Sequence, residues 1–208
     1  MTRENTVQGA PGAMLVIVSG PSGVGKDTVI AALAKLPVDP ERHFVITCTT
    51  RPRRPYEVDG EHYHFLDSET FAERREAGGF LESNNVHGHW YGTPRNEVRE
   101  ALVTGHDVVL KIDVQGAAVV KQRVPDALLV FLVPPSLEDL FSRLRNRATE
   151  TADELDIRQR NAAIELARAE DYDYVVLNET DQIERTAERV DDILTAEKAA
   201  HPDRRTRI

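Results

Sequence analysis

A glycine-rich segment, GPSGVGK at residues 20–26, stands between a continuous apolar run and a helical pattern, and it constrains the fold more than any other feature. The apolar run at residues 13–19 is typical of a β-strand that is covered on both faces. After the segment, Val29, Ile30 and Leu33 follow helical spacing. Glycines and a lysine at this spacing, between a strand and a helix, predict a phosphate-binding P-loop.

A P-loop brings backbone N–H groups, a helix N-terminus and a lysine to the same anion. The glycines allow the backbone to curl around a phosphate without side-chain clashes. The helix N-terminus adds positive character, and Lys26 is long enough to reach the outer phosphates of a nucleoside triphosphate. Asp27 departs from the usual pattern, because serine or threonine normally follows the lysine. A carboxylate can also bind magnesium, so Asp27 is a candidate metal ligand.

The rest of the chain alternates between apolar runs and helical patterns. The strand-like runs lie at residues 107–112, 127–133 and 174–177, and the helical stretches at 95–104, 136–147, 153–170 and 182–198. This alternation predicts an α/β fold with a doubly wound parallel sheet.

Two segments interrupt this alternation and suggest a division into parts. Residues 47–94 are rich in Arg, His, Tyr, Gly and Pro, and we interpret them as a small inserted mixed α/β sheet region that carries recognition residues. Residues 141–167 are crowded with Arg, Asp and Glu and predict a helical lid. The other predicted parts are a P-loop core at 13–46, 95–140 and 168–198, a disordered N-terminal arm at 1–12 and a flexible C-terminal tail at 199–208.

The composition excludes several classes of protein. The formal net charge of −9 argues against a nucleic-acid-binding protein, which normally shows a basic face. No apolar run reaches the roughly 18 residues that a membrane span needs, and the polar start lacks a secretory signal. A single cysteine, Cys48, cannot form an internal disulfide, which fits a reducing compartment. We therefore expect a cytoplasmic protein, either a monomer or a homodimer.

The insert combines residue types that suit a nucleoside monophosphate. Arg51 and Arg54 carry planar guanidinium groups that can bind phosphate oxygens two at a time. A carboxylate of the insert could accept two hydrogen bonds from the N1–H and N2–H₂ groups of guanine, which adenine does not offer on that edge. A pocket built around such an acceptor rejects the wrong base, because the acceptor is then left unpaired.

These motifs together resemble the guanylate kinase family over about residues 13–195. The matching stretches are GPSGVGK (20–26), TTRPRRPYEVDGEHYHF (49–65), FLE (80–82), YGT (91–93), IDVQG (112–116), FLVPPS (131–136) and SRLRNR (142–147). The resemblance implies a P-loop NTPase-type core and transfer of the γ-phosphate of ATP to GMP or dGMP with Mg²⁺. Positioning and charge stabilisation would then supply most of the catalysis.

The resemblance also implies roles for individual residues. The expected ATP-binding residues are Gly20, Pro21, Ser22, Gly23, Val24, Gly25, Lys26, Asp27, Thr28 and Asn178. The expected GMP-binding residues are Thr47, Arg51, Arg54, Tyr63, Glu82, Tyr91, Thr93 and Asp113. The expected catalytic cations are Lys26, Arg143, Arg147 and Arg158, and the candidate magnesium ligands are Asp27 and Asp113.

A second departure from the family pattern accompanies the first. Lys111 occupies a strand position where the family commonly has an acidic residue. The P-loop strand and this strand should be neighbours in the sheet, so Asp27 and Lys111 are expected to face each other. We hypothesise that they form a compensating pair that keeps the local charge tolerable near ATP.

Two other functions fit part of the pattern. A ribose 1,5-bisphosphate phosphokinase is similar in fold and often has Gly-Lys-Asp in its P-loop, which Asp27 favours. However, a sugar phosphate offers no guanine edge for Glu82. A non-catalytic guanylate-kinase-like interaction module typically lacks the P-loop lysine and the lid arginines, and this chain has them.

Overall fold

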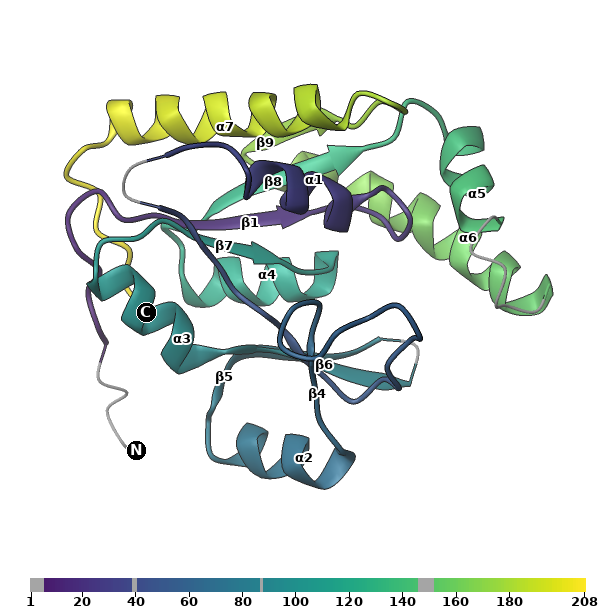
Figure 1. Ribbon diagram of the computed structural model, residues 1–208, viewed down its shortest axis with the longest axis horizontal. Helices are drawn as coiled ribbons and strands as arrows, with labels where there is room; N and C mark the ends of the chain where they lie inside the picture. The colour runs from purple at the N-terminus through teal and green to yellow at the C-terminus, as the bar shows by residue number, and fades with distance from the viewer. Residues whose placement is uncertain (1–5, 39–40, 87, 146–151) are drawn as a thin grey trace.

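The computed structural model describes residues 6–38, 41–86, 88–145 and 152–208 and places them in two sheets with flanking helices (Figure 1). Within those residues, the larger sheet has five parallel strands in the order β2-β7-β1-β8-β9. These strands are β2 His43–Phe44, β7 Val108–Lys111, β1 Leu15–Ser19, β8 Leu128–Val133 and β9 Tyr174–Leu177. The predicted α/β fold with a parallel sheet is confirmed.

Alternate side chains of β1 enter two hydrophobic cores, one on each face of the sheet. Val16 and Val18 pack in the core beneath α1 and α7, whereas Leu15 and Ile17 pack against α3 and α4. Successive strand residues point to opposite faces, so a strand that is apolar throughout requires helices on both faces. Figure 1 shows this arrangement for α1 Lys26–Leu33, α7 Ile183–Ala200, α3 Arg95–Val103 and α4 Val114–Arg123.

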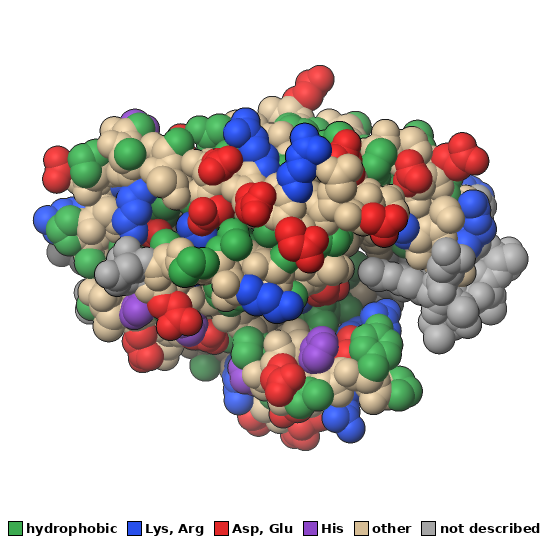
Figure 2. Space-filling view, turned by 45° about the horizontal axis from the view of Figure 1, so that its top comes forward, with side chains coloured by type: hydrophobic (Ala, Val, Ile, Leu, Met, Phe, Trp, Pro, Cys, Tyr) green, Lys and Arg blue, Asp and Glu red, His purple; other side chains and the backbone are tan. Residues whose placement is uncertain are grey.

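The insert forms a second, mixed sheet with its own small core. Among the described residues its strand order is β4-β3-β6-β5, with β3 parallel to β4 and antiparallel to β6. Phe71 and Phe80 stack with ring centroids 4.6 Å apart beside buried Cys48. The elements are β3 Cys48–Thr49, β4 His64–Phe65, α2 Ser68–Glu76, β5 Phe80–Val86 and β6 His89–Pro94. This sheet forms a lobe below the main body in Figure 2.

The segment predicted to form a lid is helical in its described part. The predicted lid at residues 141–167 includes the second half of α5 Leu137–Arg145 and all of α6 Ala152–Leu166, and it ends where the 3₁₀ helix η1 Ala167–Asp171 begins. Over the described residues, these elements agree with the helical patterns at 136–147 and 153–170. Leu140 and Leu144 are buried in the core next to the P-loop, so α5 is anchored to the main body.

The described parts of the chain ends pair with each other, in contrast to the predicted loose arm and tail. The backbone N–H of Val7 donates to the carbonyl of Ile208 at 2.7 Å, and the N–H of Ile208 donates back at 2.9 Å. The hydroxyl of Thr206 is buried and donates to the carbonyl of Ala13 at 3.0 Å. Backbone pairing needs few apolar side chains, so the polar composition of these segments did not reveal it.

Two further observations concern the helices and the surface of the described residues. None of the helices in the described ranges is both long and apolar enough to cross a bilayer. On the face drawn in Figure 2, acidic and basic side chains are intermixed instead of forming a basic patch.

Candidate active site

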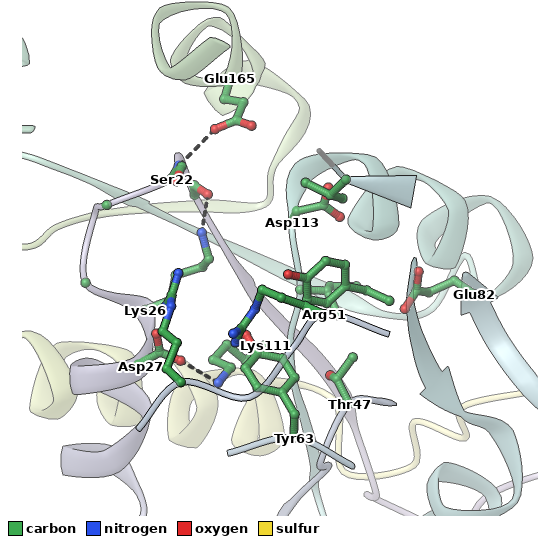
Figure 3. A pocket seen from close by; sticks show the side chains of 17 residues that line it. Ser22, Lys26, Asp27, Thr47, Arg51, Tyr63, Glu82, Lys111, Asp113 and Glu165 are labelled. Carbon is green, nitrogen blue, oxygen red and sulfur yellow. Dashed lines mark hydrogen bonds and ion pairs between the residues drawn. The ribbon is translucent and has the colours of Figure 1, made fainter. Parts of the chain in front are cut away.

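A cleft lies between the P-loop, the carboxyl end of β7 and the insert (Figure 3). In parallel α/β sheets, ligands bind at the carboxyl ends of the strands, so this position suits a substrate site. The cleft collects thirteen of the residues that the sequence singled out: Gly20, Ser22, Gly23, Gly25, Lys26, Asp27, Thr47, Arg51, Arg54, Tyr63, Glu82, Tyr91 and Asp113. It is also lined by Val86, Lys111, Ile112 and Glu165.

The P-loop conformation depends on glycine at two close approaches. Gly20 has φ of 146°, and a Cβ there would lie 2.5 Å from the carbonyl oxygen of Leu132. Gly25 has φ of 101°, and a Cβ there would lie 2.7 Å from the side-chain nitrogen of Asn178. A side chain at either position would push the loop away from the sheet, so the sequence pattern is a packing requirement as well as a ligand requirement.

Lys26 folds back over the loop. Its ammonium donates to the carbonyl of Gly20 at 2.6 Å and to the carbonyl of Pro21 at 3.2 Å. These contacts hold a positive charge at the mouth of the loop, where the outer phosphates of a nucleotide would lie.

A carboxylate from α6 accepts a hydrogen bond from the P-loop. Oε2 of Glu165 lies 2.9 Å from the backbone nitrogen of Ser22, as Figure 3 shows. Backbone N–H groups of this loop are the donors that a phosphate requires. In this conformation Glu165 therefore occupies a donor that a bound triphosphate would need.

We expect Glu165→Ala to increase the affinity for ATP about two- to fivefold, equivalent to the roughly 0.3–1 kcal/mol that an anion gains at an exposed helix N-terminus. The substitution removes the internal anion that competes for the Ser22 N–H. Calorimetric titration with ATP measures the effect, and Glu170→Ala in η1 is a matched control because Glu170 is exposed and does not line the cleft. Unchanged or weaker ATP binding by Glu165→Ala would contradict the competition.

A buried glutamate organises the arginines of the insert. Glu57, which is 4% exposed, accepts a hydrogen bond from Nη2 of Arg51 at 2.6 Å and another from the backbone N–H of Arg54 at 2.7 Å. Burial alone would raise the pKa of Glu57, but the hydrogen bond from Arg51 and the one from the Arg54 backbone lower it overall. Glu57 is therefore an anion that holds the guanidinium of Arg51 in place at the cleft.

Aromatic rings complete this side of the cleft. The guanidinium carbon of Arg51 lies 5.5 Å from the ring centroid of Tyr63. Tyr63 and Tyr91 meet edge to face with centroids 5.9 Å apart. Burial raises the pKa of Tyr63. Tyr63 is therefore a neutral hydroxyl that can donate a hydrogen bond to a phosphate oxygen.

Glu82 lies on β5 of the insert and also lines the cleft. It is almost completely buried, at 2% exposed. The β5–β6 register places Glu82 opposite Thr93, whose hydroxyl donates to Oε1 at 2.6 Å. The amide of Asn84 donates to Oε2 at 2.8 Å. Burial, with a contribution from the nearby charge of Asp113, raises the pKa of Glu82 to about 7. Each carboxylate oxygen has two acceptor sites, so both can still accept from a ligand.

Asp27 and Lys111 face each other, as the sequence predicted. Lys111 is the last residue of β7, and its ammonium lies 2.5 Å from Oδ1 of Asp27, the second residue of α1. The adjacency follows from the parallel pairing of β1 with β7, which aligns Val18 with Lys111. The same ammonium lies 5.1 Å from the ring centroid of Tyr63, so Lys111 reaches from the P-loop to the insert.

Arg143 and Asn178 do not line the cleft in this structure, although the sequence assigned them to catalysis and ATP binding. Asn178 is fully buried, and its side-chain nitrogen donates to the carbonyl of Val24 at 2.7 Å. Arg143 donates to the same carbonyl at 3.0 Å and to the hydroxyl of Thr180 at 2.9 Å. Both side chains support the P-loop from outside the cleft, which their position in the sequence could not reveal.

The remaining predicted residues are placed as follows. Pro21, Val24 and Thr28 belong to the P-loop and the start of α1 but do not line the cleft. Thr93 does not line the cleft, but its hydroxyl donates a hydrogen bond to Glu82, which does. Arg147 lies outside the described residues, and for Arg158 the structure describes only a backbone position on α6.

Asp27 suits the magnesium role that the sequence suggested. Magnesium binds through one or two carboxylates together with substrate phosphates and seldom uses an all-protein cage. The described residues contain no group of three or more His, Cys, Asp or Glu side chains that could hold a metal. Asp27 is 67% exposed and borders the P-loop. Asp113 is less available, because its Oδ1 caps α4 by accepting from the Gly116 N–H at 2.9 Å.

Glu57, Asn84, Lys111 and Glu165 also belong to the site, although the sequence gave none of them a binding role. Glu57 is three residues after Arg54, a spacing that could have suggested a partner. Asn84 is two residues after Glu82 on the same strand, so strand periodicity could have placed both side chains on one face. No sequence signal connects Glu165 with Ser22, because 143 positions separate them.

Comparisons with known proteins agree with this geometry. The family model described as guanylate kinase matches residues 12–197. The guanylate kinase of Symbiobacterium thermophilum is 43% identical over 91% of this chain and 88% of its own length. That of Chelativorans sp. is 43% identical over 93% and 87%. A crystal structure of guanylate kinase from Anaplasma phagocytophilum superposes with a TM-score of 0.71 at 30% identity, covering 91% of this chain and 88% of the other. The chain belongs to the guanylate kinase family.

Proposed function

We propose that this protein transfers the γ-phosphate of ATP to GMP or dGMP, giving ADP and the corresponding diphosphate. The observation that carries this proposal is that one cleft brings a P-loop opposite a guanidinium clamp and a buried carboxylate. The P-loop with Lys26 suits the triphosphate, Arg51 and Tyr63 suit the acceptor phosphate, and Glu82 suits the guanine edge. The protein would act in purine nucleotide metabolism in the cytoplasm, as a monomer or a homodimer.

The reaction requires alignment of two anions more than covalent chemistry. An oxygen of the GMP phosphate attacks the γ-phosphorus of ATP, the bond to the β,γ-bridging oxygen breaks, and ADP leaves with that oxygen. Lys26 holds positive charge at the outer phosphates, where negative charge is spread in the transition state. Arg51, held by Glu57, fixes the attacking phosphate on the other side of the cleft.

Magnesium, when bound, would supply further positive charge at the phosphates of the nucleotide. Asp27, directly after Lys26, is the residue of this chain best placed to hold it. The ion pair of Asp27 with the Lys111 ammonium supports a role for this carboxylate in binding positive charge.

Initial-rate assays with ATP, magnesium and a panel of acceptors test the proposal. We expect GDP from GMP, with much slower turnover of AMP, UMP and ribose 1,5-bisphosphate. Selective turnover of ribose 1,5-bisphosphate would favour the sugar phosphate kinase that Asp27 suggested. No ATP binding by calorimetry would favour a non-catalytic interaction module.

The raised pKa of Glu82 predicts pH-dependent binding of guanine. The carboxylate must be ionised to accept from N1–H and N2–H₂, but near pH 7 about half of it is protonated in the ligand-free protein, since its pKa is about 7. Guanosine affinity should fall about tenfold per pH unit below 7 and level off above pH 8, with proton release on binding at the lower pH values. Guanosine is the better ligand here because it lacks a titrating phosphate. Calorimetry in buffers of different ionisation enthalpy measures the proton release, and Glu82→Gln should abolish it.

A further inference from the structure

Lys111 occupies the point where the donor and acceptor sides of the cleft meet (Figure 3). Its ammonium contacts Asp27, which directly follows the P-loop lysine, at 2.5 Å. It also lies 5.1 Å from the ring of Tyr63, which in turn lies beside the guanidinium of Arg51. The Lys111 ammonium, the Tyr63 ring and the Arg51 guanidinium therefore form one group in the cleft, and a phosphate bound by Arg51 and Tyr63 would come close to this ammonium.

We propose that Lys111 is a catalytic residue that binds the phosphate of the acceptor nucleotide, and that Asp27 holds its ammonium only while the acceptor is absent. The proposal rests on the proposed function, because it assumes that the acceptor is a nucleoside monophosphate. It assigns a substrate contact to a strand position where the family commonly has an acidic residue.

The energetics favour this exchange of partners. Asp27 is 67% exposed, so its ion pair with Lys111 is screened by solvent and is weak. A phosphate dianion between Arg51 and Tyr63 carries more charge and would lie in a less exposed part of the cleft, since the Lys111 and Arg51 side chains are 19% and 14% exposed. The flexible stem of lysine allows the ammonium to change partners without movement of β7.

The competing explanation is that Lys111 only neutralises Asp27 and never contacts a substrate. The two explanations predict different binding results for ligands that lack a phosphate and for variants that lack Asp27. If Lys111 binds the acceptor phosphate, its loss should weaken GMP but not guanosine. If it only neutralises Asp27, then removing Asp27 as well should restore GMP binding.

The experiment is calorimetric titration of the wild-type protein and its variants with GMP and with guanosine, without ATP or divalent cation. We expect Lys111→Met to weaken GMP binding at least about tenfold, as loss of a charge-assisted contact of roughly 1.5 kcal/mol implies, and to leave guanosine binding within about twofold. Lys111→Arg should retain most of the GMP affinity. Asp27→Ser should bind GMP as tightly as wild type or more tightly.

The double variant Asp27→Ser/Lys111→Met gives the decisive comparison. We expect it to bind GMP as weakly as Lys111→Met does, because the phosphate contact is still missing. Wild-type GMP affinity in the double variant would overturn the proposal, and so would an equal loss of GMP and guanosine binding in Lys111→Met, which would indicate a structural defect. If the wild-type protein bound neither GMP nor guanosine, the proposed function itself would fail. Tight GMP binding by both the wild type and Lys111→Met would refute only the role of Lys111 and would leave the proposed function standing.

Discussion

Replacement of Lys26 by methionine is expected to reduce kcat/KM for ATP by about 10²–10³-fold. This is the typical effect of removing one preorganised hydrogen-bond donor that stabilises the negative charge of the transition state. The methionine side chain has similar length but no positive charge, so the P-loop backbone could still hold the triphosphate while the outer oxygens lost their cation. Initial rates with saturating GMP measure the change. GMP binding in the absence of ATP should stay within about twofold, because Lys26 contacts the P-loop side of the cleft.

The matched control is Lys35→Met, close to the C-terminal end of α1 and exposed, away from the cleft. This variant should retain wild-type rates. Equal losses in Lys26→Met and Lys35→Met would indicate that the effect comes from net charge or folding. Near-normal turnover by Lys26→Met would mean that the P-loop does not hold the reacting phosphates.

Replacement of Glu82 by glutamine should change which base the protein accepts. The amide keeps one acceptor oxygen but presents its NH₂ group to the second N–H group of guanine, so one hydrogen bond to a charged acceptor is lost. At pH 8 kcat/KM for GMP should therefore fall by about 10–10²-fold, as the roughly 1.5–3 kcal/mol of such a hydrogen bond implies. The same amide can pair with the acceptor N1 and the donor N6–H₂ of adenine, so kcat/KM for AMP should rise. The selectivity for GMP over AMP is the quantity to measure.

Glu82→Gln should fold with a stability close to that of the wild type at pH 8. The substitution removes the cost of a buried carboxylate, but its NH₂ group replaces one of the two oxygens that accept from Thr93 and Asn84. Thermal unfolding checks this point. Glu69→Gln on exposed α2 is the control and should leave selectivity unchanged. An unaltered ratio of GMP to AMP turnover in Glu82→Gln would assign base recognition to other residues.

Local patterns were sufficient to predict the features that depend on neighbouring residues or on the parallel sheet. The apolar run of β1, the glycine spacing and the start of α1 together define the P-loop. The contact between Asp27 and Lys111 was also predictable, because parallel pairing of β1 and β7 brings the ends of these strands together.

Side-chain directions over long sequence separations could not be predicted in the same way. The side chains of Arg143 and Asn178 both donate hydrogen bonds to the carbonyl of Val24. The direction in which these side chains point depends on how α5 and the end of β9 pack beside the P-loop. Glu165 reaches Ser22 only because α6 lies over the loop. The paired chain ends were missed because backbone hydrogen bonds between them leave no hydrophobic pattern.

The most direct test follows the transferred atom itself. The purified protein is incubated with ATP labelled at the γ-phosphate, unlabelled GMP and magnesium, and the labelled products are separated. We predict that the label appears in the β-phosphate of GDP and that the yield depends on GMP. Label that appears only as inorganic phosphate, or that remains in ATP while the protein stays folded, would contradict a cleft that aligns the two nucleotides for transfer.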